Sequence, residues 1–367
     1  MQVALSADAL SAKLSGIGRY CWELARGLGA DPRVSKVRYF VGHNWIADPQ
    51  QLLQPGFVPG GKAPWRKAAD LWWNHRRLAA PIVHAPNYFL PDWAELGIAT
   101  VHDLSVFKYP ETHPAERVKA FEAGFAATIE RAGLILTDCE WIRREVVAFT
   151  GTPAERVIAV PLGVGPEFHP RPPEELAGFA ARHRLPAGQY GLCVSTLEPR
   201  KRIGQLLAAW RTLPATLRTQ HPLVLAGGSG WRNERLMAEI ERGQSEGWLR
   251  YLGYVDEAEL PLLYAGARLF AYPSQYEGFG FPPLEAMASG VPTVVAAGTC
   301  LEETAGPAAA LVDPEDIAGF TQLLARLLTD EQERARLSPA GVQHASQYDW
   351  KRCIAGTVDA YQFMLQG

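Results

Sequence analysis

Residues Tyr272–Ala297 read YPSQYEGFGFPPLEAMASGVPTVVAA, and this stretch combines the end of a strand, a glycine-rich turn and a helix. The apolar residues Leu269–Tyr272 are typical of a buried strand, which Pro273 ends. Gly278 and Gly280 then supply a turn that exposes backbone N–H groups. A helix is expected next, because its first turn accepts the two prolines that follow. The stretch therefore predicts one strand–turn–helix unit of a parallel sheet.

Two carboxylates, Glu277 and Glu285, flank this turn. We expect Glu277 before the helix and Glu285 in its first turn. A helix N-terminus carries partial positive charge and N–H donors, so the junction suits an anion such as a diphosphate. Glu is also favoured in any first helical turn, and an ordinary tight loop would contain the same glycines. A ligand with a central diphosphate and many hydroxyls, such as a nucleotide sugar, fits the arrangement.

The bulk properties exclude several classes of protein. A chain of 367 residues predicts two domains, each of roughly 150 to 200 residues. A net charge of −3 lacks the basic excess of a nucleic-acid-binding protein. The five cysteines are scattered without C-x-x-C spacing, which indicates neither disulfides nor zinc and favours a reducing cytoplasm. We expect neither a secretion signal nor a membrane-spanning helix, because no basic leader or long apolar run is found.

The whole chain alternates short apolar runs with helical patterns, which predicts an α/β fold with parallel sheets. Proline and glycine are frequent at residues 161–173, which indicates the approach to an interdomain hinge. We therefore expect domains at 1–168 and 169–349, with a last helix at about 350–367 packing back on the first domain. The expected strands are Val3–Ser6, Lys36–Val41, Ile82–Ala85, Ile98–His102, Leu134–Thr137, Val157–Val160, Tyr190–Thr196, Leu223–Ala226, Arg250–Gly253, Leu269–Tyr272, Thr293–Ala296 and Ala309–Val312.

Two adjacent cations follow the first expected strand of the second domain, in the sequence STLEPRK at 195–201. Arg200 can clamp two phosphate oxygens, and Lys201 adds a point charge, so the pair suits a diphosphate. Neutralising a leaving group lowers the barrier to its departure. For the Arg-Lys pair alone, a solvated basic turn is the competing interpretation.

Glycine pairs follow two other expected strands. Gly227 and Gly228 end one strand and would let the backbone approach a base or phosphate, although an ordinary β–α turn reads the same. Gly16 and Gly18 precede the first helix and would present N–H groups to an anion. A G-x-G pattern alone is a weak signal for a binding site.

His102 and Asp103 close another expected strand, at the edge of the sheet where doubly wound folds place a ligand. A single His at a strand end is more often structural. A polar group near the ligand is the functional alternative.

Taken together, these stretches resemble the retaining glycosyltransferases of the GT-B fold with a Glu-x7-Glu signature. This group 1, family 4 type includes bacterial mannosyl- and rhamnosyltransferases. The resemblance implies two Rossmann-like domains with a deep interdomain cleft, the first binding the acceptor and the second a nucleotide sugar. The matching motifs are GIGRY at 16–20, HAPNYFLP at 84–91, HDL at 102–104, TLEPRK at 196–201 and YEGFGFPPLE at 276–285.

The resemblance also implies roles for individual residues. His102 would contact the sugar, Glu277 would hold its hydroxyls, and Arg200 and Lys201 would stabilise the departing phosphates. Glu285 would hold the nucleotide ribose. Transfer would occur on one face with retention, the leaving phosphate helping to deprotonate the acceptor hydroxyl. Further donor-binding residues would be Gly16, Gly18, Gly227, Gly228, Tyr254, Val255, Gly278, Phe279 and Gly280, and acceptor-side residues Asn87, Tyr88 and Asp103.

The function implied by the resemblance is transfer of a hexose or deoxyhexose from a GDP-sugar. Mannose or rhamnose is the expected sugar. The acceptor would be a glycan or lipid-linked saccharide of bacterial surface polysaccharide, such as the O-antigen of lipopolysaccharide. The enzyme would act in the cytoplasm or at the cytoplasmic face of the inner membrane. A UDP-sugar-dependent transferase, a nucleotide-sugar 2-epimerase of the same fold and a non-catalytic glycan-binding protein remain alternatives.

Two expectations concern what the enzyme needs. No D-x-D motif with neighbouring acidic residues is found, so we expect no metal and no cofactor besides the donor. Residues Trp65–Arg77 predict an amphipathic helix with Trp72 and Trp73 on its apolar face. Such a helix either lies at a membrane surface or packs on the first domain.

Overall fold

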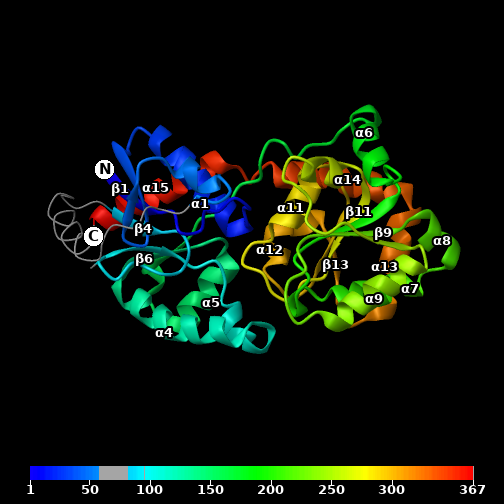
Figure 1. Cartoon of the computed structure of the whole chain (residues 1–367), viewed down its shortest axis with the longest axis horizontal. Helices are drawn as coiled ribbons and strands as arrows, with labels where there is room; N and C mark the ends of the chain where they lie inside the picture. Colours follow the sequence, from blue (N-terminus) through cyan, green and yellow to red (C-terminus); the bar gives the residue numbers. More distant parts are fainter. Residues whose placement is uncertain (58–81, 95, 367) are drawn as a thin grey trace. The chain divides into compact units, whose positions relative to one another are not determined.

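The computed structural model describes residues 1–57, 82–94 and 96–366, so the expected helix at 65–77 lies outside the described residues. The chain divides into two compact units, and each is built around its own sheet (Figure 1). The first unit consists of Met1–Lys108, Ala115–Gly163 and Asp349–Gly367, and the second of Tyr109–Pro114 and Val164–Tyr348.

The division between the units differs from the expected boundary after residue 168. The chain leaves the first unit after Gly163 and returns to it at Asp349. The N–H of Val164 donates to the carbonyl of Tyr348 at 3.0 Å, so the outgoing and returning segments are hydrogen-bonded. Residues 109–114, expected with the first domain, group with the second unit.

The first sheet has the order β3-β2-β1-β4-β5-β6-β7 in the described residues. Its strands are parallel except for β3, which pairs antiparallel with β2. The expected strands are present, but β3 was missed, because a three-residue strand after a turn at Gly42 leaves no apolar run to detect. The strands are β1 (Gln2–Ser6), β2 (Lys36–Val41), β3 (Asn44–Ile46), β4 (Ile82–Ala85), β5 (Gly97–Thr100), β6 (Ala132–Thr137) and β7 (Val157–Ala159).

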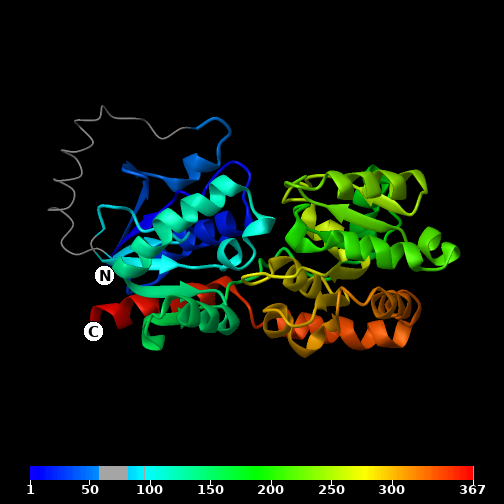
Figure 2. The same ribbon diagram turned by 90° about the horizontal axis from the view of Figure 1, so that it is seen from below.

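Helices cover both faces of this sheet. Figure 1 shows α1 and α15 on one face and α4 and α5 on the other. The last helix, α15, packs on α1 and β6, and Figure 2 shows it running along the first unit. The helices of this unit are α1 (Gly16–Gly27), α3 (Ser105–Lys108), α4 (Ala115–Arg131), α5 (Glu140–Thr150) and α15 (Trp350–Gln366), with 3₁₀ turns at Leu28–Ala30, Pro49–Leu53 and Ala154–Arg156.

The second sheet is parallel throughout and has the order β10-β9-β8-β11-β12-β13 in the described chain. Its core is tight: a Cβ at Gly191 on β8 would lie 2.1 Å from the ring of Trp210, which is fully buried. The strands are β8 (Tyr190–Val194), β9 (Leu223–Ala226), β10 (Leu249–Tyr251), β11 (Ala267–Tyr272), β12 (Thr293–Ala296) and β13 (Ala310–Val312).

Helices also cover the second sheet, with α13 packed on α7 and α14 packed on α11. A 3₁₀ turn, η5, follows β8, and another, η3, lies in the early segment that joins this unit. The helices are α6 (Pro173–His183), α7 (Ile203–Thr212), α8 (Ala215–Gln220), α9 (Glu234–Ser245), α10 (Leu260–Ala265), α11 (Phe281–Ala288), α12 (Leu301–Ala305), α13 (Ile317–Thr329) and α14 (Glu331–Ala345), with 3₁₀ turns η3 (Pro110–Thr112), η5 (Pro199–Lys201) and η6 (Gly306–Ala308).

The order of the second sheet places a topological switch point between β8 and β11. From β8 the chain proceeds outward to β9 and β10, and then returns to β11 on the other side of β8. Crossover connections leave these two neighbouring strands in opposite directions, and open α/β sheets bind their ligands in the crevice that such a switch point forms at the carboxyl ends of the strands. The loops after β8 and β11 meet at this crevice, and they contain the two motifs that the sequence singled out.

In the first unit, a buried polar contact fastens α15 to the sheet. His84 on β4 has its Nδ1 atom 2.7 Å from the Tyr361 hydroxyl and its Nε2 atom 2.9 Å from the Thr100 hydroxyl. Burial, with a smaller effect of the nearby His102, lowers the pKa of His84 to about 3. The ring is therefore neutral at pH 7, with one nitrogen donating and the other accepting.

Replacing Tyr361 by Phe should destabilise this junction. The change leaves a buried His84 nitrogen without its hydroxyl partner, which costs about 1–3 kcal/mol of unfolding free energy. Thermal or urea unfolding measures the loss. Phe363→Leu is the matched control on the same helix, because Phe363 is 51% exposed. Equal stability of Tyr361→Phe and the wild type would contradict the role of this contact.

Candidate active site

The loops after β8 and β11 are hydrogen-bonded to each other. The N–H of Gln275 donates to the carbonyl of Arg200 at 2.9 Å. In the other direction, Nη1 of Arg200 donates to the carbonyl of Tyr276 at 2.5 Å. Because these residues adjoin Lys201 and Glu277, the two contacts fix the charged side chains at the switch point.

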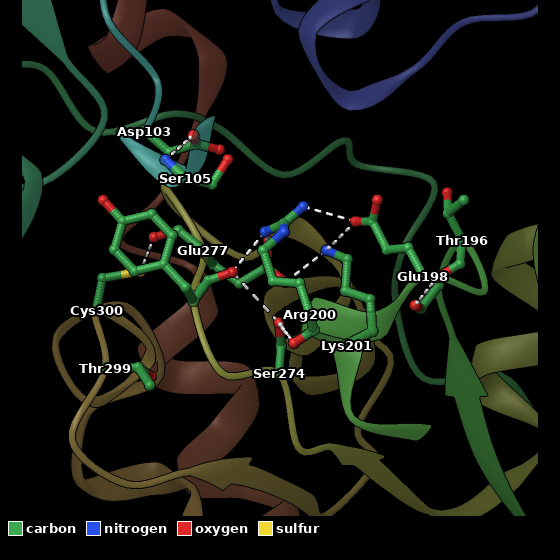
Figure 3. Close-up of polar contacts among 12 residues, drawn as sticks. Asp103, Ser105, Thr196, Glu198, Arg200, Lys201, Ser274, Glu277, Thr299 and Cys300 are labelled. Atoms are coloured by element: carbon green, nitrogen blue, oxygen red, sulfur yellow. Dashed lines mark hydrogen bonds and ion pairs between the residues drawn. The ribbon is translucent and has the colours of Figure 1, made fainter. Parts of the chain in front are cut away.

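A buried ion pair occupies this junction (Figure 3). Nζ of Lys201 lies 2.5 Å from Oε1 of Glu277, and Nη1 of Arg200 lies 3.3 Å from Oε2. Burial alone would raise the pKa of Glu277, but the charges of Lys201 and Arg200 outweigh it and lower the pKa to about 2. Glu277 is therefore an ionised acceptor of hydrogen bonds at neutral pH.

Sequence reasoning missed a second carboxylate in the cluster. Nη2 of Arg200 donates to Oε1 of Glu198 at 2.7 Å, and Nζ of Lys201 is 3.9 Å from the same oxygen (Figure 3). Glu198 is only 4% exposed. Its presence inside the TLEPRK motif was the available signal, because a carboxylate two residues before an Arg is within reach of it.

Two further contacts could not be found from local sequence. The thiol of Cys300, which precedes α12, donates to the carbonyl of Glu277 at 2.9 Å. The hydroxyl of Tyr272, at the end of β11, accepts from Nζ of Lys201 at 3.0 Å, and burial raises the pKa of this hydroxyl. Both residues therefore support the ion pair.

Helix α11 makes Glu285 its fifth residue, just past the first turn. Gly280 has φ of +94°, and the helix starts directly after it at Phe281. The expectation that Glu285 lies in the first turn is therefore wrong, although its side chain is buried. Pro282 and Pro283 occupy that turn and have no N–H groups, which leaves more of any anion's charge to the neighbouring cations.

The glycine-rich loop after β9 packs on the loop after β8. Gly227 has φ of +134°, and a Cβ there would lie 2.1 Å from the carbonyl oxygen of Ser195. The carbonyl of Gly228 accepts a hydrogen bond from the N–H of Leu197 at 2.9 Å. In this structure Gly227 is thus needed for contact between two loops, and the loop before Glu198 is held in place.

The other expected donor-binding residues of this unit differ in exposure. Tyr254 follows β10 and is 47% exposed, whereas Val255 is buried. The ring of Phe279 packs against Phe281 and Tyr348. Gly278 lies in the loop after β11, directly beside Glu277.

The early segment Tyr109–Pro114 also reaches this site, as part of the second unit. The Trp231 indole N–H donates to the carbonyl of Thr112 at 2.7 Å, and the ring of Tyr109 lies 5.3 Å from that of Tyr276. The segment therefore supports both the loop after β9 and the loop that contains Glu277. Sequence analysis gave no sign of this contact.

In the first unit, His102 is engaged at both ring nitrogens. Nε2 donates to the Pro86 carbonyl at 2.8 Å, and Nδ1 lies 2.8 Å from Oδ2 of Asp138. Burial opposes a charged ring, but Asp138 and the hydrogen bonds together raise the pKa of His102. A hydrogen bond from this ring to a sugar hydroxyl would require one of these bonds to break.

The other expected residues of the first unit have structural contacts. The Tyr88 ring is 2% exposed, and its hydroxyl accepts from the N–H of Asp103 at 3.0 Å. Asp103 in turn accepts from the N–H of Ser105, while Asn87 is half-buried. Gly16 is the exposed first residue of α1, and the N–H of Gly18 donates to the Ser15 hydroxyl that caps this helix.

Across the described residues, no three His, Cys, Asp or Glu side chains are placed to hold a metal ion. Independence of metal ions stays a prediction. Among the same residues, no helix is long and apolar enough to cross a membrane.

Comparison with known proteins identifies the class. Residues 186–344 match the family model of glycosyl transferases group 1. The chain is 34% identical to O-antigen chain mannosyltransferase B of Escherichia coli, across 99% of this chain and 100% of the relative. The chain therefore belongs to the group 1 glycosyltransferases, which confirms the family that its motifs resemble.

Solved structures confirm the GT-B fold. Sucrose-phosphate synthase from Thermosynechococcus elongatus matches 100% of this chain and 99% of its own, with a TM-score of 0.75 and 21% identity. WaaG, a glycosyltransferase involved in lipopolysaccharide biosynthesis, matches 97% of this chain and 98% of its own, with a TM-score of 0.72 and 17% identity.

The Glu277 ion pair predicts a pH-dependent stability difference. Glu277→Gln leaves Glu198 to balance two buried cations, so one positive charge is uncompensated. Its unfolding free energy should be about 3 kcal/mol below that of the wild type at pH 6. The pKa is depressed from 4.5 to about 2 on folding, so the stabilisation is complete above pH 4.5 and is lost as the pH falls toward 2. At pH 3.5 the gap should be smaller by about 1.4 kcal/mol.

Thermal unfolding of both proteins at the two pH values measures this difference. Glu241→Gln, an exposed change in the middle of α9, is the control and should match the wild type at both. A gap between Glu277→Gln and the wild type that stays constant with pH would show that the carboxylate's charge is not what stabilises the junction.

Proposed function

We propose that this glycosyltransferase moves a mannosyl residue from GDP-mannose to a glycan or lipid-linked saccharide acceptor. The product would be a bacterial surface polysaccharide of the O-antigen type. Transfer would proceed with retention of the anomeric configuration, at the cytoplasmic face of the inner membrane. The identity of 34% to an O-antigen chain mannosyltransferase over nearly the whole chain supports mannose and this acceptor class.

The observation that carries the proposal is the buried cation pair at the switch point of the second sheet. Arg200 and Lys201 lie at the carboxyl ends of β8 and β11, where open α/β sheets bind their ligands. Two cations there suit the diphosphate of a nucleotide sugar. Glu285, buried on α11, is proposed to accept a hydrogen bond from the ribose.

Leaving-group stabilisation is the proposed source of catalysis. Arg200 and Lys201 would donate to the phosphate oxygens as negative charge develops on them. Glu277, which is ionised at neutral pH, would accept hydrogen bonds from the sugar hydroxyls. The leaving phosphate would take the proton of the acceptor hydroxyl. With these two cations stabilising the leaving group, the reaction would need no metal ion.

Transfer assays with purified protein test the donor and the reaction. With a mannose-terminated oligosaccharide, GDP-mannose should give an α-mannosylated product in the presence of EDTA, and NMR should show an α linkage. GDP-rhamnose, UDP-glucose and UDP-N-acetylglucosamine are the comparison donors. Transfer only from a UDP-sugar, isomerisation of a donor without acceptor, or dependence on Mg²⁺ would each contradict the proposal.

The two glutamates should separate in their effects. Glu285→Gln replaces the charged ribose acceptor by a weaker, neutral amide oxygen and should raise the Kd for GDP about tenfold, a loss of about 1.4 kcal/mol. Glu277→Gln should lower kcat about 100-fold or more without weakening the binding of GDP, because Arg200 and Lys201 remain in place. Calorimetric titration with GDP and steady-state kinetics measure both. An unchanged Kd for GDP in Glu285→Gln would contradict this division of roles.

A further inference from the structure

Glu198 is a buried carboxylate that has no role in the reaction as proposed above. Its carboxylate receives Nη2 of Arg200 at 2.7 Å and lies 3.9 Å from Nζ of Lys201. Glu277 lies against the same two cations through its own carboxylate. Arg200 is therefore held by one carboxylate on its own loop and by another on the loop after β11.

The backbone gives Glu198 little freedom to move. Its N–H donates to the carbonyl of Thr196 at 3.0 Å, and its carbonyl accepts from the N–H of Lys201 at 3.0 Å. Pro199 follows it and opens the 3₁₀ turn η5. The preceding Leu197 is hydrogen-bonded to the glycine-rich loop. The carboxylate is thus presented to Arg200 by a fixed stretch of chain.

The charges of the cluster balance. Glu198 and Glu277 carry two negative charges, and Arg200 and Lys201 carry two positive charges. All four side chains are at most 12% exposed, so water screens them little. In the proposed reaction Glu277 keeps its charge and also accepts from the sugar hydroxyls, whereas Glu198 acts on the cations.

We propose that Glu198 is a positioning residue with two effects on the transfer reaction. It orients the Arg200 guanidinium toward the crevice, and its charge weakens the hold of the cations on the nucleoside diphosphate product. This inference rests on the function proposed above. Without the charge of Glu198, the cluster would have one uncompensated positive charge and would bind donor and product alike more tightly. Tight binding that is not specific to the transition state does not raise kcat.

Two substitutions separate the charge of Glu198 from its geometry. Glu198→Gln keeps an oxygen that accepts from Arg200 but removes the charge, so GDP should bind about tenfold more tightly than to the wild type. Glu198→Asp keeps the charge but shortens the reach to Arg200. It should lower kcat about tenfold or more while the Kd for GDP stays within about threefold of the wild type.

The control is Glu315→Gln, which removes a carboxylate from a neighbouring pair. Oε1 of Glu315 lies 2.7 Å from Nη1 of Arg202, but its side chain is 61% exposed. Water screens this pair, so the variant should match the wild type in GDP affinity and in kcat. Agreement would show that a tighter complex in Glu198→Gln comes from the buried position and not from lost negative charge in general.

Calorimetric titration and GDP-induced thermal stabilisation are the measurements, with UDP titrated in parallel. For each variant, the melting temperature with GDP is compared with that of the same variant without GDP. A destabilised Glu198→Gln protein therefore still reports its affinity for GDP. Unchanged or weaker GDP binding by Glu198→Gln, relative to a wild type that binds GDP, would overturn the inference. A wild type that binds neither GDP nor UDP would instead contradict the proposed function itself.

Discussion

The buried pair of Lys201 and Glu277 is the interaction on which the second unit's site depends. Removing two charges from water is costly, and their attraction repays this only when further hydrogen bonds satisfy both groups. Here Arg200 donates to the carboxylate of Glu277 and the Tyr272 hydroxyl accepts from the ammonium of Lys201, while the Cys300 thiol holds the backbone carbonyl of Glu277. The pair links the loops after β8 and β11, so a change in either loop exposes or strands a charge in the other.

Close backbone packing makes this pair possible. The loop after β8 has to be rigid, because a buried cation needs its partner at hydrogen-bond distance. Gly227 and Gly230 let the neighbouring loop approach Ser195 and Leu197 so closely that a Cβ would lie 2.1 and 2.3 Å from their carbonyl oxygens. Tyr109–Pro114 contacts the loop after β11 through Tyr276 and the loop after β9 through Trp231.

The strands and the cation pair were predictable because their signals are local. A buried parallel strand reads as an apolar run, and Arg200 and Lys201 are adjacent in sequence. The contacts of Cys300 and Tyr109–Pro114 depend on tertiary packing, which no local pattern encodes. Glu285 was misplaced within its helix because prolines are accepted throughout the first turn, so they do not mark which residue begins it. Gly280, with positive φ, sets that start.

The pKa of Glu277 excludes one chemical role for this residue, that of a general acid. A pair of carboxylates in a glycoside hydrolase includes one general acid, whose pKa must be raised so that it holds a proton near neutral pH. The adjoining cations instead lower the pKa of Glu277 to about 2, so it has no proton to give. In the proposed reaction, bond cleavage relies instead on stabilising the leaving group. That requirement makes the orientation and residual charge of Arg200, and therefore Glu198, as consequential as the two glutamates that define the signature.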